Sequence, residues 1–161
     1  MKILVMSDSL GNIKNMLTAV HTESPDMILH LGDHHTDCRE LREKFPEIPL
    51  RAVKGNCDRA GELEMDEFIC EYLRIMMVHG HRFNVKYSLD ALVTNAMYKE
   101  CDIVLYGHTH IPDCHREEDG LWVVNPGSAG SSGGSVALME TNENRIISCR
   151  ILRQEDLEEM V

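Results

Sequence analysis

The chain has 161 residues, 43% of them hydrophobic, and a formal net charge of −11 at pH 7, which is typical of one globular domain with one sizeable core. The negative charge argues against a nucleic-acid partner, because such proteins normally present a basic face. No apolar run reaches the roughly 18 residues that a membrane-spanning helix requires, so no membrane span is expected.

The first third of the chain alternates short apolar runs with helical patterns. Apolar runs at 2–7, 26–31 and 50–53 predict buried strands. Helices are expected between them, one after Asn12 and a shorter one that ends before Pro46. This alternating order is typical of a parallel sheet covered by helices, with right-handed crossovers.

The order changes in the rest of the chain, where strands follow one another more closely and one helix is expected at 88–99. Further strands are predicted at 64–70, 72–78, 103–106, 113–116, 121–124, 135–140 and 145–152. The first two of these are almost adjacent, which predicts an antiparallel pair. We expect a single domain over 1–161, made of two mixed sheets packed together with helices outside and an acidic tail at 152–161.

Polar side chains with metal-binding chemistry stand at the ends of five of these apolar runs. They are Asp8, Asp33, Asn56, His79, His108 and His110. The last two follow Gly107, and a glycine-led loop can aim two imidazoles separately. Carboxylates suit hard divalent ions, imidazoles suit borderline first-row metals, and an amide oxygen adds no charge. The set therefore favours manganese, iron, zinc or nickel over calcium.

Two such ions, roughly 3.5–4 Å apart, would clamp a phosphoryl group and generate a hydroxide nucleophile near neutral pH. The reaction that these residues would serve is the hydrolysis of a phosphate ester. The five motifs that contain them are Asp-Ser-Leu-Gly-Asn at 8–12, Gly-Asp at 32–33, Gly-Asn-Cys-Asp at 55–58, His-Gly-His at 79–81 and Gly-His-Thr-His at 107–110.

In order and spacing these motifs resemble those of the calcineurin-like metallophosphoesterases, and in particular the small YfcE-type phosphodiesterases. The resemblance implies a four-layer α/β/β/α sandwich and a metal-dependent phosphodiesterase or phosphatase. It implies that Asp33, Asn56 and His79 are catalytic residues. It further implies that Asp8 and His110 bind one metal, that Asn56, His79 and His108 bind the other, and that Asp33 bridges the two.

Three further residues are predicted to lie near the substrate: Cys57, Asn125 and Gly127. In larger members of the family a histidine that acts as general acid follows the motif asparagine, and here Cys57 takes that place. A thiol with a pKa of about 8.5 is a poor general acid near neutrality, so good leaving groups would be favoured; alternatively, Cys57 simply packs near the metals. Asn125 and Gly127 belong to a segment, 125–128, that resembles a recurrent family loop near the site.

Leu10 departs from the family pattern, because the family has a histidine ligand of the first metal at this position. Loss of that imidazole should cost at least the roughly 10–100-fold in affinity that loss of a supporting hydrogen-bond partner costs. We therefore predict a weak or empty first site, and one or two bound ions in total. His34 or His35 could swing in as a replacement, although solvent exposure of both is the expected alternative.

Two interpretations of the function follow. The first is an enzyme, a hydrolase that acts on small phosphate esters. The second is a catalytically impaired binding or scaffold protein, for which the phosphoesterase-fold subunit of retromer is a precedent. The intact ligand positions other than Leu10 favour the enzyme. Specificity is expected to lie in the loops at 84–88, 111–112 and 127–134, while the physiological substrate and the oligomeric state, a homo-oligomer included, are left open.

Six cysteines are spread along the chain without a Cys-x-x-Cys pair, which argues against zinc-ribbon and thioredoxin-type motifs. Free thiols are the rule in a reducing compartment. The first apolar run begins at Lys2, which leaves no room for a signal peptide before it. We therefore expect a cytoplasmic protein.

Overall fold

The computed structural model of the chain describes residues 1–58, 63–143 and 145–159. Its strands are β1 (Lys2–Met6), β2 (Met27–His30), β3 (Leu50–Ala52), β4 (Met65–Cys70), β5 (Leu73–Val78), β6 (Ile103–Leu105), β7 (Asp113–Arg116), β8 (Trp122–Asn125), β9 (Ser135–Asn142) and β10 (Arg145–Arg153). Its α-helices are α1 (Lys14–Glu23), α2 (Cys38–Lys44), α3 (Asp90–Tyr98) and α4 (Gln154–Glu159). Every predicted strand is present, with its ends within two residues of the expected ones.

The strands of the described residues form two five-stranded mixed sheets. The first has the order β10-β9-β1-β2-β3. Strands β1, β2 and β3 are parallel to one another, and β9 is antiparallel to both of its neighbours, β1 and β10. The second has the order β4-β5-β6-β8-β7, with β5, β6 and β8 parallel and an antiparallel strand at each edge. The carboxyl ends of parallel strands meet at one edge of each sheet, where loops can converge.

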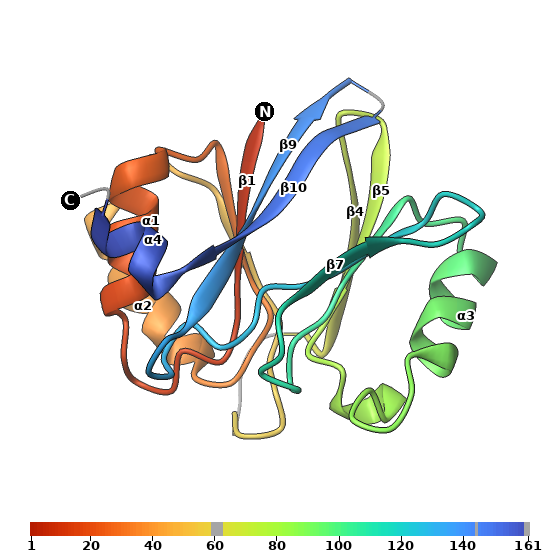
Figure 1. Cartoon of the computed structure of the whole chain (residues 1–161), viewed down its shortest axis with the longest axis horizontal. Helices are drawn as coiled ribbons and strands as arrows, with labels where there is room; N and C mark the ends of the chain where they lie inside the picture. Colours follow the sequence, from red (N-terminus) through yellow and green to blue (C-terminus); the bar gives the residue numbers. More distant parts are fainter. Residues whose placement is uncertain (59–62, 144, 160–161) are drawn as a thin grey trace.

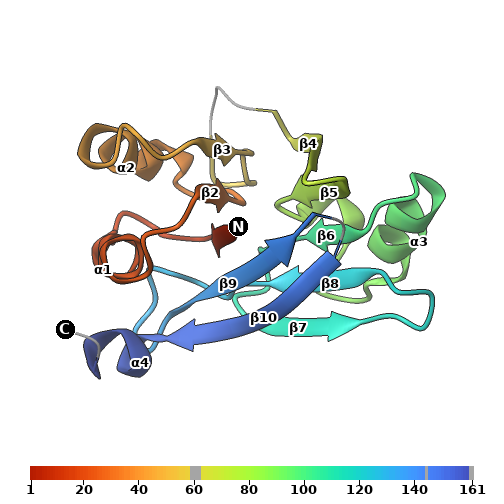
Figure 2. The ribbon, with the colours of Figure 1, turned by 90° about the horizontal axis from the view of Figure 1, so that it is seen from above.

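The two sheets pack face to face, and helices cover both outer faces (Figure 1). Helices α1, α2 and α4 lie on the first sheet and α3 lies on the second, as the view from above also shows (Figure 2). This is the α/β/β/α sandwich that the resemblance implied, so the predicted fold class is confirmed.

Alternation of side chains along each strand explains why the apolar runs are continuous. In β1, Ile3 and Val5 join the core between the sheets, whereas Leu4 joins the core beneath α1 and α4. In β5, Met77 faces the neighbouring sheet and Met76 faces α3. Each central strand therefore serves two cores, and both of its faces must be apolar.

The carboxyl-terminal segment, where an acidic tail ending in a short helix or a frayed end is expected at 152–161, contains a short helix. Its first residues, 152 and 153, complete β10, and 154–159 form α4. Leu157 is 1% exposed and packs in the same core as α1, while residues 160–161 lie outside the described part of the chain. Within the described residues, none of the helices combines the length and apolar character that crossing a bilayer would require.

Candidate metal centre

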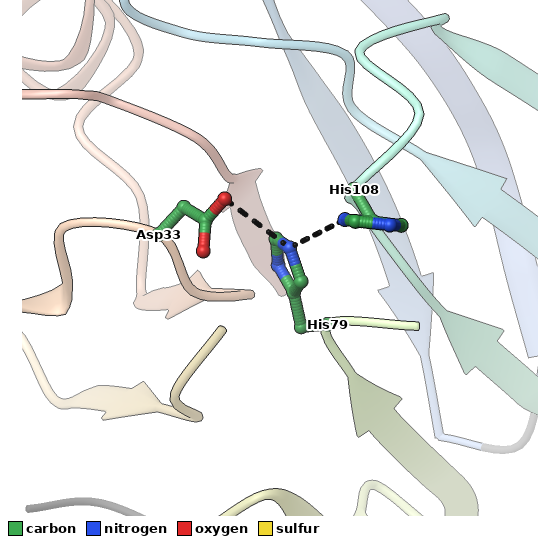
Figure 3. A group of neighbouring side chains, drawn as sticks. All are labelled: Asp33, His79 and His108. Carbon is green, nitrogen blue, oxygen red and sulfur yellow. Dashed lines mark hydrogen bonds and ion pairs between the residues drawn. The ribbon is translucent and has the colours of Figure 1, made fainter. Parts of the chain in front are cut away.

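Loops that follow five strands, three from the first sheet and two from the second, carry the predicted ligands. Asp8, Asp33 and Asn56 follow β1, β2 and β3, and His79, His108 and His110 follow β5 and β6. Among the described residues, Asp33, His79 and His108 form a group whose ligand atoms all lie within 4.8 Å of one another. Figure 3 shows these three side chains, which we call the Asp33 cluster, gathered around His79.

His79 is the centre of the Asp33 cluster and is fully buried. Its Nε2 lies 3.4 Å from Oδ2 of Asp33 and 3.2 Å from Nδ1 of His108. Its Nδ1 lies 2.8 Å from the backbone oxygen of Leu31, so Nδ1–H donates to that carbonyl. This hydrogen bond fixes the ring and directs Nε2 toward the cluster, as is usual for histidines that ligate metals.

The donor set of the Asp33 cluster fits a divalent cation better than a proton. A proton on Nε2 of His79 can point toward Asp33 or toward His108, but not toward both. A cation would accept lone pairs from all three side chains, and a carboxylate with two imidazoles suits manganese, iron or zinc. Burial, together with the charge of His79, lowers the pKa of His108 to about 4, so at neutral pH this imidazole is in the neutral form that binds metals.

Asp33 is held by the loop that follows β3. Its Oδ1 accepts a 2.9 Å hydrogen bond from the backbone N–H of Cys57, and a Cβ on Gly55 would lie only 2.1 Å from the same oxygen. Burial opposes the carboxylate form, but hydrogen bonds from His79 and Cys57 outweigh it and lower the pKa of Asp33. Asp33 is therefore ionised and fixed, which suits a ligand.

Asp58 organises the same region, a role that the sequence did not assign to it. Its carboxylate accepts backbone N–H groups from Asp33 at 3.0 Å, His34 at 2.8 Å and Gly55 at 2.8 Å. One side chain thus ties the loop after β2 to the loop after β3. The signal was its place at the end of the Gly-Asn-Cys-Asp motif, next to the predicted ligand Asn56.

Asp8 is fully buried between the ends of β1 and β6. Its Oδ2 accepts from Ser7 Oγ at 2.5 Å and from the His108 backbone N–H at 3.2 Å. A Cβ on Gly107 would lie 2.2 Å from Ser7 Oγ, so only glycine allows this close approach. Burial raises the pKa of Asp8, although the charge of His79 and the Ser7 hydrogen bond oppose it. A nearby cation would offset this cost.

Four predicted ligands have backbone conformations that most residues avoid. The φ angles of Asp8, Asp33, His108 and His110 are 53°, 56°, 69° and 64°. Left-handed conformations of this kind cost on the order of 1–3 kcal/mol each and concentrate at functional sites. The surrounding hydrogen bonds stabilise them.

The side of the centre near Leu10 is more open. Leu10 is 41% exposed, and the side chain of His110 is 42% exposed, with Nε2 3.1 Å from Oδ1 of Asp8. His34 is also exposed, and its Nδ1 lies 4.0 Å from where a Cβ on Gly11 would stand, beside the Leu10 loop. Within the described residues, Asp8 and His110 do not form a second three-residue group like the Asp33 cluster. The side chain of His35 lies outside the described part.

The predicted substrate contacts differ among themselves. Cys57 and Asn56 are exposed, and Nδ2 of Asn56 lies 3.7 Å from the Cys57 sulfur. Asn125 is fully buried: its Nδ2 donates to Gly107 O at 3.2 Å and Thr109 Oγ1 at 2.9 Å, and its Oδ1 accepts from Gly127 N at 2.9 Å. Asn125 therefore braces the loop that contains both histidines, and its side chain is not open to the surface.

The sequence matches the family model described as the Calcineurin-like phosphoesterase superfamily domain over residues 1–144. The chain belongs to this superfamily. A Mycoplasma pneumoniae protein described as a probable metallophosphoesterase is 35% identical over 130 residues, which cover 79% of this chain and 78% of that protein. Phosphodiesterase YfcE of Escherichia coli K12 is 29% identical over 130 residues, 73% of this chain and 66% of YfcE. The resemblance stated from the motifs is confirmed.

The same fold is found in the crystal structure of Vps29 from Entamoeba histolytica complexed with Zn²⁺. The two structures superpose with a TM-score of 0.77 at 21% identity, over 95% of this chain and 98% of Vps29. At this identity the similarity concerns the fold alone. Membership of the superfamily implies a divalent metal, and the Asp33 cluster is a group of described residues that suits one.

Proposed function

We propose that this chain is a single-domain, metal-dependent phosphoesterase that hydrolyses small phosphate esters, diesters in particular. Asp33, Asn56, His79 and His108 would hold the principal ion, with manganese the first candidate and nickel, iron and zinc the others. The observation that carries the proposal is the Asp33 cluster, where three ligand atoms converge within 4.8 Å in a member of the superfamily. The absence of any Cys-x-x-Cys pair among the six cysteines of the sequence supports a reducing, cytoplasmic compartment.

A divalent ion in this cluster would polarise the phosphoryl oxygens and lower the pKa of a coordinated water. The chain's own residues would set the geometry. His79 is oriented by Leu31 O, and Asp33 by the Cys57 N–H. In the overall reaction the oxygen of water bonds to phosphorus and the ester P–O bond breaks. The alcohol leaves and takes up a proton.

Cys57 would lie beside the phosphate without acting as an efficient acid. Partial desolvation raises the pKa of its thiol although the side chain is exposed, and its hydrogen bond with Asp33 raises that pKa further. A thiol that holds its proton this firmly gives little help to an alkoxide leaving group near neutrality. We therefore propose a preference for esters of acidic alcohols. Asn125 and Gly127 would act as positioning residues for the His108–His110 loop.

The second ion position would be the weaker one. Asp8, Asp33 and His110 remain to form it, because Leu10 stands where the family resemblance implies a histidine. The 42% exposure of the His110 side chain supports the proposal, since a solvated imidazole gains less from an ion than a buried one. His34, beside the same loop, is the candidate replacement ligand.

A second candidate function is a binding protein that keeps the fold without turnover. One observation favours it: Leu10, 41% exposed, replaces an implied ligand. Hydrolysis of bis-p-nitrophenyl phosphate and p-nitrophenyl phosphate across a manganese titration separates the two candidates. We expect the wild type to hydrolyse the diester and His79→Ala to lose the activity. A silent wild type with an active Leu10→His variant would favour the binding protein, and two silent proteins would contradict the enzyme.

A further inference from the structure

A cleft of about 580 Å³ opens beside the metal centre, between the His108–His110 loop and the segment that precedes α3. Its walls are mainly apolar and include Val85, Leu89, Tyr106, Ile111 and Pro112. Thr109, which separates the two histidines, also lines it. The cleft and the metal centre therefore share one loop, the one that carries His108, Thr109 and His110.

The base of the cleft is part of the folded core. Val85 is 5% exposed and Tyr106 4%, and both belong to the core beneath α3. Thr109 is fixed by the Asn125 amide at 2.9 Å. At the rim, by contrast, Ile111 is 67% exposed. A preformed apolar cavity with an exposed apolar rim is the usual form of a small-molecule site, and ligand pockets span about 300–1,000 Å³.

The charges in the cleft restrict what it can hold. Lys86 lines it and is exposed, and within the described residues no carboxylate pairs with it. Asp113, the acidic residue in the cleft, is paired with His115, with 2.6 Å between Oδ2 and Nδ1. Lys86 is thus the charged side chain of the cleft that has no counter-ion among the described residues, which disfavours a cationic group beside it.

We propose that this cleft binds one organic arm of a phosphodiester whose phosphate lies at the Asp33 cluster, and that this arm is bulky, flat and mainly apolar, such as an aromatic or heteroaromatic alcohol. A small polar alcohol would leave the apolar walls in water, and a cationic one would face Lys86. The inference rests on the proposed function, because that function places the phosphate at the cluster.

Phenylphosphonate and methylphosphonate test the proposal, because their P–C bonds resist hydrolysis and the two differ only in the arm. Calorimetric titration of the manganese-loaded protein should show phenylphosphonate binding about tenfold more tightly, as burial of the larger apolar group predicts. Ile111→Ser should reduce the ratio of the two affinities, phenylphosphonate over methylphosphonate, several-fold without weakening the binding of methylphosphonate. Ile147→Ser is the matched control, since Ile147 is 57% exposed on β10, and its ratio should equal that of the wild type.

A third probe, 2-aminoethylphosphonate, carries a cationic arm. It should bind the wild type more weakly than methylphosphonate does, and Lys86→Gln should narrow that difference. Equal affinity for phenyl and methyl arms, or an unchanged ratio in Ile111→Ser, would overturn the proposal. Hydrolysis of bis-p-nitrophenyl phosphate is measured in parallel. Hydrolysis of the diester without a preference between the phosphonates would contradict the proposed role of the cleft and leave the proposed function standing. A preference for phenylphosphonate without hydrolysis would contradict the proposed function and leave the role of the cleft standing.

Discussion

The two sides of the metal centre use the same kinds of side chain but bury and support them differently. On the Asp33 side, His79 is fully buried and Asp33 is 4% exposed. His79 is fixed through its second nitrogen and Asp33 through its second oxygen. On the Leu10 side, the His110 side chain is 42% exposed, and its described polar contact is with Asp8.

This difference shows which part of the centre is organised before an ion arrives. Ligands whose orientation is already fixed lose little freedom when they bind a metal, and their partners in hydrogen bonding support that affinity. We therefore expect one ion bound tightly by the Asp33 cluster and a second bound loosely near Leu10.

The largest effect is expected from His79→Ala, which removes the central ligand. Loss of a supporting partner alone costs about 10–100-fold in metal affinity or activity, so loss of this ligand should cost at least 100-fold in both. Manganese affinity and diester hydrolysis measure the effect. His21→Ala, on the exposed side of α1, is the matched control. A retained affinity in His79→Ala would mean that the cluster is not the principal site.

Leu10→His should strengthen the binding of the second ion, on the Leu10 side of the centre. A restored imidazole beside Asp8 is expected to tighten the second ion by about 10–100-fold, with little change at the first. Ile147→His supplies an exposed histidine elsewhere as the control. His34→Ala in the wild-type background is the complementary test: a further loss of second-ion affinity would identify His34 as the replacement ligand, whereas no change would leave the position to Asp8, Asp33 and His110.

Asn125→Ala should weaken metal binding by roughly tenfold, because it releases the loop that presents His108 and His110. The reason is the buried amide that holds Gly107 O and Thr109 Oγ1. Manganese affinity should fall along with kcat. A variant with unchanged metal affinity and only a raised KM would instead identify Asn125 as a substrate contact. Thermal unfolding in the presence of chelator separates loss of fold from loss of metal.

The smallest effect concerns His115, which lies between two carboxylates but outside the metal centre. Its nitrogens contact Asp113 at 2.6 Å and Glu117 at 3.1 Å. Burial opposes its charge, but the hydrogen bonds with Glu117 and Asp113 outweigh it and raise the pKa. The protonated His115 therefore stabilises the folded state fully at a pH below the pKa that this imidazole has in the unfolded chain. That stabilisation is lost as the pH rises through its higher pKa in the folded state. The free energy of unfolding of His115→Gln should be lower than that of the wild type at pH 5.5 and equal to it at pH 9. A difference between the two proteins that grows as the pH rises would contradict this prediction.

The fold was largely predictable because its strands are buried on both faces. Runs such as 2–7 and 72–78 are continuously apolar, and that pattern identified β1 and β5. The pairing partners of the strands late in the chain could not be predicted from the sequence in the same way. Strand β9 pairs with β1 across most of the chain, with Lys2 opposite Glu140, and no local pattern encodes such a distant pairing.

The convergence of the candidate ligands was predictable from their places after strands, whereas roles that depend on burial were not. His79 and Asp33 follow strands and carry ligand atoms, so their convergence followed from topology. Asn125 has the same side-chain chemistry as Asn56, yet it is buried and braces a loop whereas Asn56 is exposed. Ser128, like Asn125, is a buried residue with a bracing role: its hydroxyl donates to the backbone oxygen of Asp8 at 2.8 Å, across 120 positions of sequence.

The most direct test of the unequal metal centre is a calorimetric titration of the metal-free wild-type chain with manganese. We predict one ion per chain bound tightly and a second bound at least about 10-fold more weakly, since the Leu10 side keeps His110 but lacks the second imidazole that the family resemblance implies at position 10. Two ions bound with equal affinity would contradict the central claim that the Leu10 side, where the His110 side chain is 42% exposed, is less organised than the Asp33 side, where His79 is fully buried.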